Sequence, residues 1–298
     1  MKNMSARLPM RAAAMVLVLL LSACASVMET QGPPRKENIF AVTASMDLIQ
    51  FNAGQPQRVL ARKRLTGLAA GERLVGIDYR VARGVLYALA SNGQLYTLDT
   101  ATATLKPVGA APSAVPLVGL LTGFDFNPAA DRIRVVGDTG QNLRLHPDTG
   151  AAVDGNPAQP GIQGDAALAY APGDRQSGQS PAVVAAAYTY NKKDDKLTTN
   201  FAVDRRLGML VMQGSAEGSA PVVSPNSGVL TTVGPLGLGP LVDAGFDIAD
   251  VSGAAFLVVR TAEQPRTRLH LVDLATGRAQ FIGTVGDGAP LVGMAVEP

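Results

Sequence analysis

The sequence predicts an all-β protein, a β-propeller of five four-stranded blades, with a short sixth blade as the alternative. Three observations favour this fold. The chain holds 32 Gly and 20 Pro, which favour many tight turns over long helices. A strand that ends in a polar residue recurs at spacings of 47, 47, 58 and 69 residues. The two ends of the chain also supply complementary parts of one blade.

The recurring strand runs into a turn, and its last side chain can accept backbone N–H bonds from that turn. The five final residues are Asn52, Asp99, His146, Asp204 and Asp273. A second phrase lies upstream in the units and reads GIDY at 76–79, GFDF at 123–126, LAY at 168–170, GFDI at 245–248 and LVGMAVEP at 291–298. Apolar and polar residues alternate with the period of two expected of strands. Four strands in about 40 to 50 residues are typical of a propeller blade.

The two ends of the chain explain each other. Residues 38–65 contain the second, the third and a candidate fourth strand of a unit, whereas residues 291–296 contain only a first strand. Placing this last strand in the first blade closes the ring and leaves no free sheet edge. Residues 38–298 are therefore predicted to form a single propeller domain.

Residues 1–23 are predicted to be a lipoprotein signal peptide. Three basic residues, Lys2, Arg7 and Arg11, precede an apolar run at 12–21 that is too short to span a bilayer as a helix. The run ends in Leu-Ser-Ala-Cys, and Cys24 is the only cysteine of the chain. This tetrapeptide resembles a bacterial lipobox, in which the cysteine is lipidated, for example with palmitate, and becomes the mature N-terminus. Residues 24–37 would then be the lipidated cysteine and a flexible tether. An ordinary signal peptide or an uncleaved anchor is the alternative.

Removal of this peptide takes away three basic residues and leaves 23 basic side chains against 24 acidic ones. The remaining charges nearly balance, so a nucleic-acid partner, which would need clustered Lys and Arg, is not expected. We expect a monomer that touches a membrane only through its N-terminal lipid. No Asp follows Cys24. By resemblance to sorted lipoproteins, the exported protein is expected at the periplasmic face of the outer membrane if the cell is Gram-negative.

Three acidic residues of the upstream phrase, Asp78, Asp125 and Asp247, occupy equivalent places in three units. In GFDF the aspartate faces away from the two phenylalanines. The first strand of each propeller blade lines the central channel, so these carboxylates are expected to converge. The favoured hypothesis is that each accepts backbone N–H bonds from the neighbouring blade and locks the ring. The alternatives are a proton-transfer pair or a site for Ca²⁺ or another divalent ion. Blades one and four are expected to carry Ala295 and Ala169 there.

A second candidate cluster lies in one unit and consists of Asp131, Arg132, Arg134, Asp138, Asn142, Arg144 and His146. Its three arginines alternate with apolar residues, which predicts an exposed polar face over a buried apolar one. Arginines on a strand face can pair with carboxylates through two hydrogen bonds each. We favour a salt-bridge ladder to the next strand over an anionic ligand. His146 is interpreted as a turn residue, and His270 as an exposed or hydrogen-bonded strand residue.

Motifs of common enzyme classes are absent from the sequence. It contains no G-x-S-x-G, H-E-x-x-H or CxxC motif and no phosphate-binding glycine loop. With only two histidines, a Ser–His–Asp arrangement would need His146 or His270, and neither lies near a candidate serine.

Four stretches carry a family resemblance: LVGIDYRVARGVLYALASNGQLYTLDTATA, GFDFNPAADRIRVVGDTGQNLRLHPDTGAAVDG, AAAYTYN and GFDIADVSGAAF. Together they resemble the bacterial family called domain of unknown function 4394, over residues 39–296. The resemblance implies a β-propeller-like fold and an exported location, and it implies no catalytic residues. This chain departs from the family pattern at His146, where members usually read LNPDTG.

Two functional hypotheses follow. The first is a lipid-anchored module of the cell envelope that binds an envelope protein or a small ligand, or acts as a scaffold, without catalysis and without a cofactor. The second is a hydrolase that uses a divalent ion held by Asp78, Asp125 and Asp247, as lactonase-type propellers do. The chain has no Trp, which disfavours a glycan as the ligand.

Overall fold

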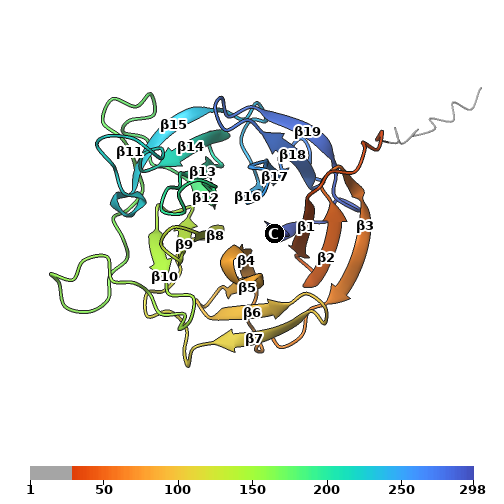
Figure 1. Cartoon of the computed structure of the whole chain (residues 1–298), viewed down its shortest axis with the longest axis horizontal. Helices are drawn as coiled ribbons and strands as arrows, with labels where there is room; N and C mark the ends of the chain where they lie inside the picture. The colour runs from red at the N-terminus through yellow and green to blue at the C-terminus, as the bar shows by residue number, and fades with distance from the viewer. Residues whose placement is uncertain (1–28) are drawn as a thin grey trace, which may run out of the picture. The chain divides into compact units, whose positions relative to one another are not determined.

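Twenty strands of the described chain form five small sheets that stand around one axis as the blades of a propeller (Figure 1). This computed structural model describes residues 29–298, of which Gln31–Pro298 form one unit. The two helices within the described range are single 3₁₀ turns, η1 and η2. The predicted all-β class and five blades are confirmed, and the described residues form no sixth sheet.

Blade one joins the two ends of the chain. From the axis outward it consists of β20 (Leu291–Val296), β1 (Asn38–Thr43), β2 (Asp47–Asn52) and β3 (Gln55–Arg64). β20 pairs with β1 in antiparallel register, with Ala295 opposite Phe40, and Figure 1 shows the C-terminus beside β1. The predicted closure of the first blade by the last strand is therefore confirmed.

In three further blades the strands follow chain order from the axis to the rim. Blade two consists of β4 (Leu74–Arg80), β5 (Val85–Ala90), β6 (Leu95–Asp99) and β7 (Thr104–Val108), with η1 (Val81–Arg83) after β4. Blade three consists of β8 (Thr122–Asn127), β9 (Arg132–Gly137) and β10 (Asn142–Leu145). Blade five consists of β16 (Asp243–Ile248), β17 (Ala255–Arg260), β18 (Arg268–Val272) and β19 (Ala279–Thr284). Blade three thus lacks the fourth strand that was predicted, and one isolated bridge from Leu145 to Ala152 stands in its place.

Blade four has five strands. From the axis outward they are β12 (Val183–Tyr188), β13 (Asn200–Asp204), β14 (Met209–Gln213), β15 (Val229–Pro235) and β11 (Ala169–Tyr170), and η2 (Pro225–Ser227) precedes β15. The prediction that residues 168–170 form its axial strand is wrong, because β11 lies at the rim, where it pairs in parallel with β15. β12 takes the axis since all six of its residues are buried and three of them are alanines. Ala187, and not Ala169, is therefore the residue at the aspartate position of blade four.

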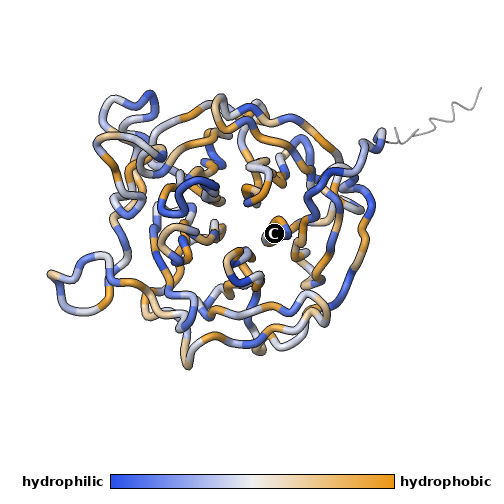
Figure 2. Tube along the Cα trace, viewed as in Figure 1, coloured by the Kyte–Doolittle hydropathy of each residue, from blue (hydrophilic) through white to orange (hydrophobic). Residues whose placement is uncertain are grey.

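Hydrophobic side chains fill the junctions between neighbouring blades. Each of five buried clusters joins residues of two adjacent blades, and Figure 2 shows hydrophobic residues along the strands of every blade. Between blades two and three, for example, the ring of Tyr87 meets the ring of Phe126 edge-on, with centroids 5.1 Å apart. Between blades three and four, Val136 is the one described residue of blade three in the buried apolar cluster. This junction is therefore held by polar contacts as well.

Small residues let the five axial strands approach one another. Four glycines and one alanine face the axis at the same level: Gly76, Gly123, Ala185, Gly245 and Gly293. A Cβ atom added to Gly123 would lie 2.8 Å from the Cα atom of Ala185, and one added to Gly76 would lie 2.5 Å from the Cβ atom of Phe124. Real Cβ atoms essentially never lie this close to another heavy atom, so the ring needs glycine at positions 76 and 123. The cavity left at this level measures about 20 Å³.

The segment predicted as a tether is partly bound to blade one. The N–H of Arg35 donates to Oδ1 of Asn52 at 2.8 Å, and Nδ2 of Asn52 donates to the carbonyl oxygen of Arg35 at 2.9 Å. Nε2 of Gln55 donates to the carbonyl oxygen of Gly32 at 3.0 Å. The predicted signal peptide and Cys24 lie outside the described residues. Within residues 29–298 there is no helix of the length and apolar character that crossing a bilayer requires.

The close approach at the axis can be tested with Gly123→Ala. We expect this variant to lose about 1 to 3 kcal/mol of unfolding free energy, because its new methyl group meets the backbone of blade four. Urea denaturation of the purified protein measures the change. Ala216→Ser, on an exposed loop, should stay within about 0.5 kcal/mol of the wild type. A Gly123→Ala variant as stable as this control would contradict the packing argument.

Candidate functional site

The structure brings together the three acidic residues of the axial strands. Asp78 of β4, Asp125 of β8 and Asp247 of β16 are each at most 6% exposed. One carboxylate oxygen from each lies within 4.8 Å of the other two. Gly and Asp are two residues apart, so both lie on the same face of each strand. The glycines let the axial strands come close together, and the carboxylates can then reach the neighbouring strands.

Each of these carboxylates accepts a hydrogen bond from the axial strand of the next blade. The bonds run from the N–H of Phe126 to Asp78 at 2.7 Å, of Tyr188 to Asp125 at 2.9 Å and of Val296 to Asp247 at 2.6 Å. Each donor follows the aspartate position of its own strand by one residue. These are the contacts that the locking hypothesis requires.

The two remaining junctions follow blades that carry alanine, at Ala187 and Ala295, in the aspartate position. In the blades that come next, Asp247 accepts the N–H of Ile248 at 2.6 Å, and Asp78 accepts the N–H of Tyr79. Three side chains therefore satisfy five buried N–H groups, one in every blade. An unsatisfied buried N–H costs about 1 to 3 kcal/mol, so these acceptors matter to the stability of the ring.

The three carboxyl groups hold protons more tightly than ordinary aspartates do. Burial, followed by the charges of Asp78 and Asp247, raises the pKa of Asp125. The carboxyl groups of Asp78 and Asp125 hydrogen-bond to each other. Ionised carboxylates only accept hydrogen bonds, so this contact requires a proton. We assign the proton to Asp125, because Asp78 already accepts two N–H bonds.

Asp247 gives the cluster a pH dependence. Burial raises the pKa of its carboxyl group from 3.8 to about 6. The folded state therefore binds this proton more tightly than the unfolded chain does. The resulting stability is fully present below about pH 4 and is lost as the pH rises to about 6.

The same cluster could hold a cation instead of a proton. Ca²⁺ takes oxygen ligands at about 2.3 to 2.6 Å, and the spacing of Asp78, Asp125 and Asp247 is compatible with a shared ion. The three side chains would supply carboxylate oxygens and nothing else, and several of their lone pairs already accept N–H bonds. Tyr190 follows β12, and burial and then the charges of all three aspartates raise the pKa of its phenol. Sequence reasoning missed Tyr190, since it belongs to no repeated phrase.

A larger cavity of about 230 Å³ lies at the end of the channel where the axial strands begin. We call it the channel mouth. Its wall is mostly apolar and includes Leu120, which is 78% exposed. Its charged residues are Arg73, Asp243 and Arg260, and Nε of Arg260 donates to Asp243 at 2.8 Å. Arg73 is exposed and forms no ion pair within residues 29–298. The sequence did not indicate this cavity, because loops between different blades build it.

The seven residues of the second candidate cluster lie in separate places. Asp131 forms an ion pair with Arg80 of blade two, which also donates to Asp148 at 2.6 Å. Asp138 accepts the N–H of Leu120 at 3.1 Å, beside the channel mouth. The remaining residues except His146 face blade four. The unit therefore supplies contacts in three directions and forms no single site.

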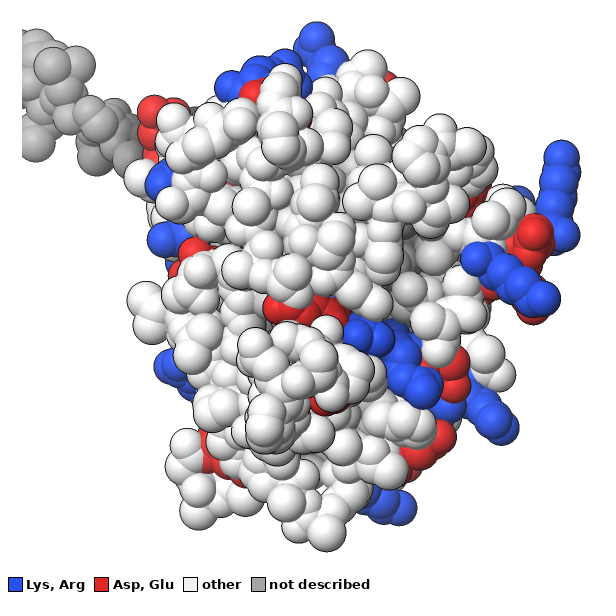
Figure 3. All heavy atoms as spheres, turned by 90° about the vertical axis from the view of Figure 1, so that its left-hand side faces the viewer, with Lys and Arg blue, Asp and Glu red and all other residues white. Residues whose placement is uncertain are grey.

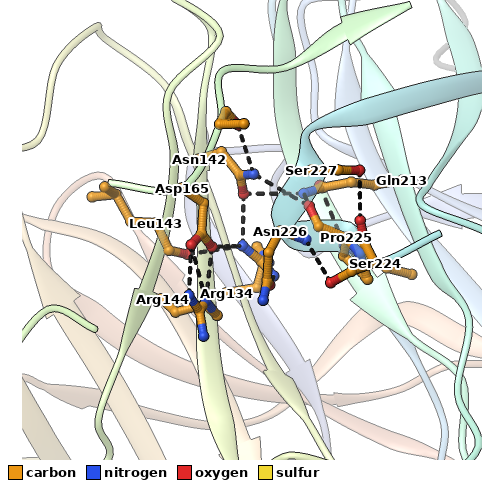
Figure 4. A network of polar contacts seen from close by, with 12 residues as sticks. Arg134, Asn142, Leu143, Arg144, Asp165, Gln213, Ser224, Pro225, Asn226 and Ser227 are labelled. Atoms are coloured by element: carbon orange, nitrogen blue, oxygen red, sulfur yellow. Dashed lines mark hydrogen bonds and ion pairs between the residues drawn. The ribbon is translucent and has the colours of Figure 1, made fainter. Parts of the chain in front are cut away.

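Arg134 is the centre of a buried polar network between blades three and four (Figure 4). Its side chain is 2% exposed, and Nη1 donates to Asp165 and to Asn142, both at 2.7 Å. Nη2 donates to Oδ1 of Asn226 at 2.6 Å. Asp165 also binds Arg144, whose Nε and Nη2 donate to it at 2.8 and 2.7 Å. Figure 3 shows basic side chains beside acidic ones on this side of the molecule.

The predicted exposed face of arginines is therefore wrong for Arg134, and the predicted ladder to a neighbouring strand is wrong as well. The carboxylate that binds both arginines is Asp165, which lies in the loop after β10. Blade three has no fourth strand, and this loop covers the edge of β10 instead, where the N–H of Asp165 donates to the carbonyl oxygen of Asn142 at 2.9 Å. A buried guanidinium needs such a partner, since an unpaired buried charge is strongly destabilising.

The two histidines differ in their surroundings. Nδ1 of His146 accepts the N–H of Asp148 at 3.2 Å. Four other strand ends bond in the same way to the residue two positions on: Asn52 to Gly54, Asp99 to Ala101, Asp204 to Arg206 and Asp273 to Ala275. His146 is thus a turn residue. His270 is 3% exposed, its Nδ1 has no partner within the described chain, and burial lowers its pKa to about 4. His270 lies in β18 as predicted, but it is buried rather than exposed, and its Nδ1 lacks the predicted hydrogen bond.

The locking role of the aspartates makes two substitutions differ. Asp247→Asn should have an unfolding free energy about 1 to 3 kcal/mol lower than that of Asp125→Asn, because its amide leaves one of two N–H donors without an acceptor. Asp125→Asn should be as stable as the wild type or more stable at pH 8. Its Oδ1 can accept the N–H of Tyr188, while its Nδ2 donates to Asp78 as the protonated acid does. Urea denaturation at pH 8 checks both, and equal losses in the two variants would contradict the assignment.

The chain has a family relationship and distant structural likenesses. No curated protein matches it. Three of the solved structures that resemble it are a nidogen/laminin complex, a protein of unknown function from Bacteroides thetaiotaomicron and TolB from Acinetobacter baumannii. Their identities to this chain are 11%, 13% and 12%, and their TM-scores are 0.47, 0.40 and 0.41. The matches cover 88%, 80% and 89% of this chain and 98%, 57% and 68% of the other chains, in the same order.

The family match covers the ring almost completely. Residues 47–295 match the model of a family described as a domain of unknown function, DUF4394. The matched region begins at β2 and ends in β20, so it includes the aspartates of the axis and the arginines of blade three. The chain belongs to the DUF4394 family.

Proposed function

We propose that this propeller is a non-enzymatic binding module of the cell envelope, anchored by a lipid on Cys24, whose partner is an envelope protein bound at the channel mouth. The observation that carries the proposal is the contrast along the channel. The middle of the channel is closed by glycines and by hydrogen-bonded aspartates, whereas its mouth is open and includes the exposed side chains of Arg73 and Leu120.

The aspartates of the axis are poorly suited to act on a substrate. They are buried, they accept five N–H groups, and the carboxyl groups of Asp78 and Asp125 hydrogen-bond to each other. At the level of the axial glycines the channel holds a cavity of about 20 Å³, room for little more than one water molecule. A substrate would have to displace the contacts that hold the blades together.

The channel mouth has the chemistry of a binding surface. Leu120 and Leu121 provide an apolar wall, and Arg73 provides a positive charge without an ion-pair partner in the described chain. An exposed apolar residue beside an arginine is typical of surfaces that bind proteins. A partner that inserts an apolar side chain next to an acidic one would complement this surface.

The anchor rests on the sequence. The basic residues, the short apolar run and Leu-Ser-Ala-Cys at 21–24 are the features of a bacterial lipoprotein. A single acyl chain binds membranes weakly, and a second chain is needed for stable anchoring. A multiply acylated Cys24 would hold the ring at a membrane surface, where an envelope protein could reach the channel mouth.

The alternative function is that of a hydrolase with a divalent ion between Asp78, Asp125 and Asp247. The observation that favours it is that one oxygen of each carboxylate group lies within 4.8 Å of the other two. An ion there would balance the negative charges of the three carboxylates, and it would supply a Lewis acid. The aspartates would hold this ion.

A site-specific crosslink tests the binding proposal. The photoreactive p-benzoylphenylalanine is placed at position 120 of the mouth or at position 222, since Leu120 and Val222 are 78% and 80% exposed. In intact cells we expect one defined crosslinked species from position 120 and none from position 222. Arg73→Glu should reduce this crosslink at least about tenfold, because it repels an acidic partner. No crosslink at position 120, or one that Arg73→Glu leaves unchanged, would contradict the proposal.

Metal analysis of the purified protein separates the two functions. The hydrolase requires near-stoichiometric Ca, Mg, Mn or Zn, loss of thermal stability with EDTA, and loss of the metal in Asp125→Asn. The binding proposal expects neither bound metal nor an effect of EDTA.

A further inference from the structure

We propose that the cavity between blades three and four is a second binding site, which takes a small dianion carried by a phosphate group or by two carboxylate groups. The site lies apart from the channel mouth and does not depend on the function proposed for it. The mouth lies where the axial strands begin, whereas this cavity is lined by Asn127 and Tyr188 at the ends of β8 and β12.

The cavity measures about 170 Å³, several times the roughly 10 to 15 Å³ that one water molecule needs. Its wall contains Arg132, Arg134 and Arg144 from β9 and β10. Asn226, next to the arginines in Figure 4, closes it from blade four. An arginine offers a planar pair of N–H donors that matches the oxygens of phosphate and carboxylate groups.

The charges of this wall do not balance. Three guanidinium groups face the cavity, and Asp165 is the described carboxylate that pairs with two of them, Arg134 and Arg144. Arg132 donates to the carbonyl oxygen of Asp131 at 2.8 Å and forms no ion pair within residues 29–298. The carboxylate of Asp131 binds Arg80 instead. The site thus carries two positive charges in excess, which a dianion would neutralise.

The uncharged polar groups of the wall are arranged as donors. Oδ1 of Asn127 accepts the N–H groups of Ala129 and Ala130, which leaves its Nδ2 to donate. Oδ1 of Asn226 accepts from Arg134, which leaves the side-chain nitrogen Nδ2 of Asn226 to donate.

The hydroxyl group of Tyr188 follows the same rule. Its oxygen accepts from Nε of Arg134 at 3.2 Å, and no described acceptor takes its proton. The side-chain acceptors of Asn127, Asn226 and Tyr188 are thus occupied by protein donors, while their own donors remain for a ligand. Such a surface suits an oxyanion, which only accepts hydrogen bonds.

The network behind the wall keeps these donors in place. Arg134 bonds to Asp165, Asn142, Asn226 and Tyr188, so its guanidinium is fixed before a ligand arrives. A fixed donor set raises affinity, because less side-chain freedom is lost on binding. Arg132 is half-buried and stands outside this network, so it can be replaced without disturbing the junction between the blades.

Calorimetric titration of the full chain, purified in detergent, tests the site. Inorganic phosphate and succinate are titrated separately at constant ionic strength in chloride buffer. We expect saturable binding of at least one of them. Phosphate alone would identify the ligand as a phosphate compound, and succinate alone as a dicarboxylate. Arg132→Gln should weaken the binding at least about tenfold, since a charged hydrogen bond is lost.

The matched control is Arg58→Gln, an exposed arginine on β3 of blade one, and it should bind as the wild type does. The proposal is overturned if neither anion binds at millimolar concentration. It is equally overturned if Arg132→Gln binds normally, or if Arg58→Gln is weakened to the same degree. The crosslink from position 120 should persist in Arg132→Gln, and anion binding should persist in Arg73→Glu. The two experiments therefore test the two sites independently, and failure of one proposal leaves the other unaffected.

Discussion

The hydrogen bonds between buried aspartates and the N–H groups of neighbouring axial strands are the constraint on which this ring depends. Five strands converge at the axis, and their backbones come so close that glycine or alanine must face it. A carboxylate two residues further on reaches across the junction and bonds the next strand. The aspartates stand in three blades, and together they accept one N–H group from each of the five.

The ring is least regular between blades three and four. Blade three lacks an outer strand, and the loop that covers it brings Asp165 onto Arg134 and Arg144. Polar contacts there replace part of the apolar packing that fills the other junctions. The cavity lined by arginines lies at this junction.

The closed middle of the channel separates the two larger cavities described above. The mouth lies at one end of the axial strands, and the arginine cavity lies between two blades near the other. A ligand at either place would meet side chains that the core does not need, such as Arg73 and Arg132. The hydrogen-bonded aspartates hold the blades in position, so these side chains of both cavities can be replaced without loss of the fold. Such separation is common where one fold serves several functions.

The sequence by itself determined the class of fold, the five units, the closure of blade one by β20, the turn residues such as His146 and the equivalence of the three aspartates. These features repeat, and a strand period or a turn bond is a local property that one stretch of chain can reveal. Only the tertiary structure decided that β12 takes the axis of blade four, that Asp165 binds Arg134 and that His270 is buried without a partner for Nδ1. The channel mouth and the place of Tyr190 were likewise evident only from the tertiary structure. Each of them depends on which loop packs against which blade, and that contact leaves no period in the sequence.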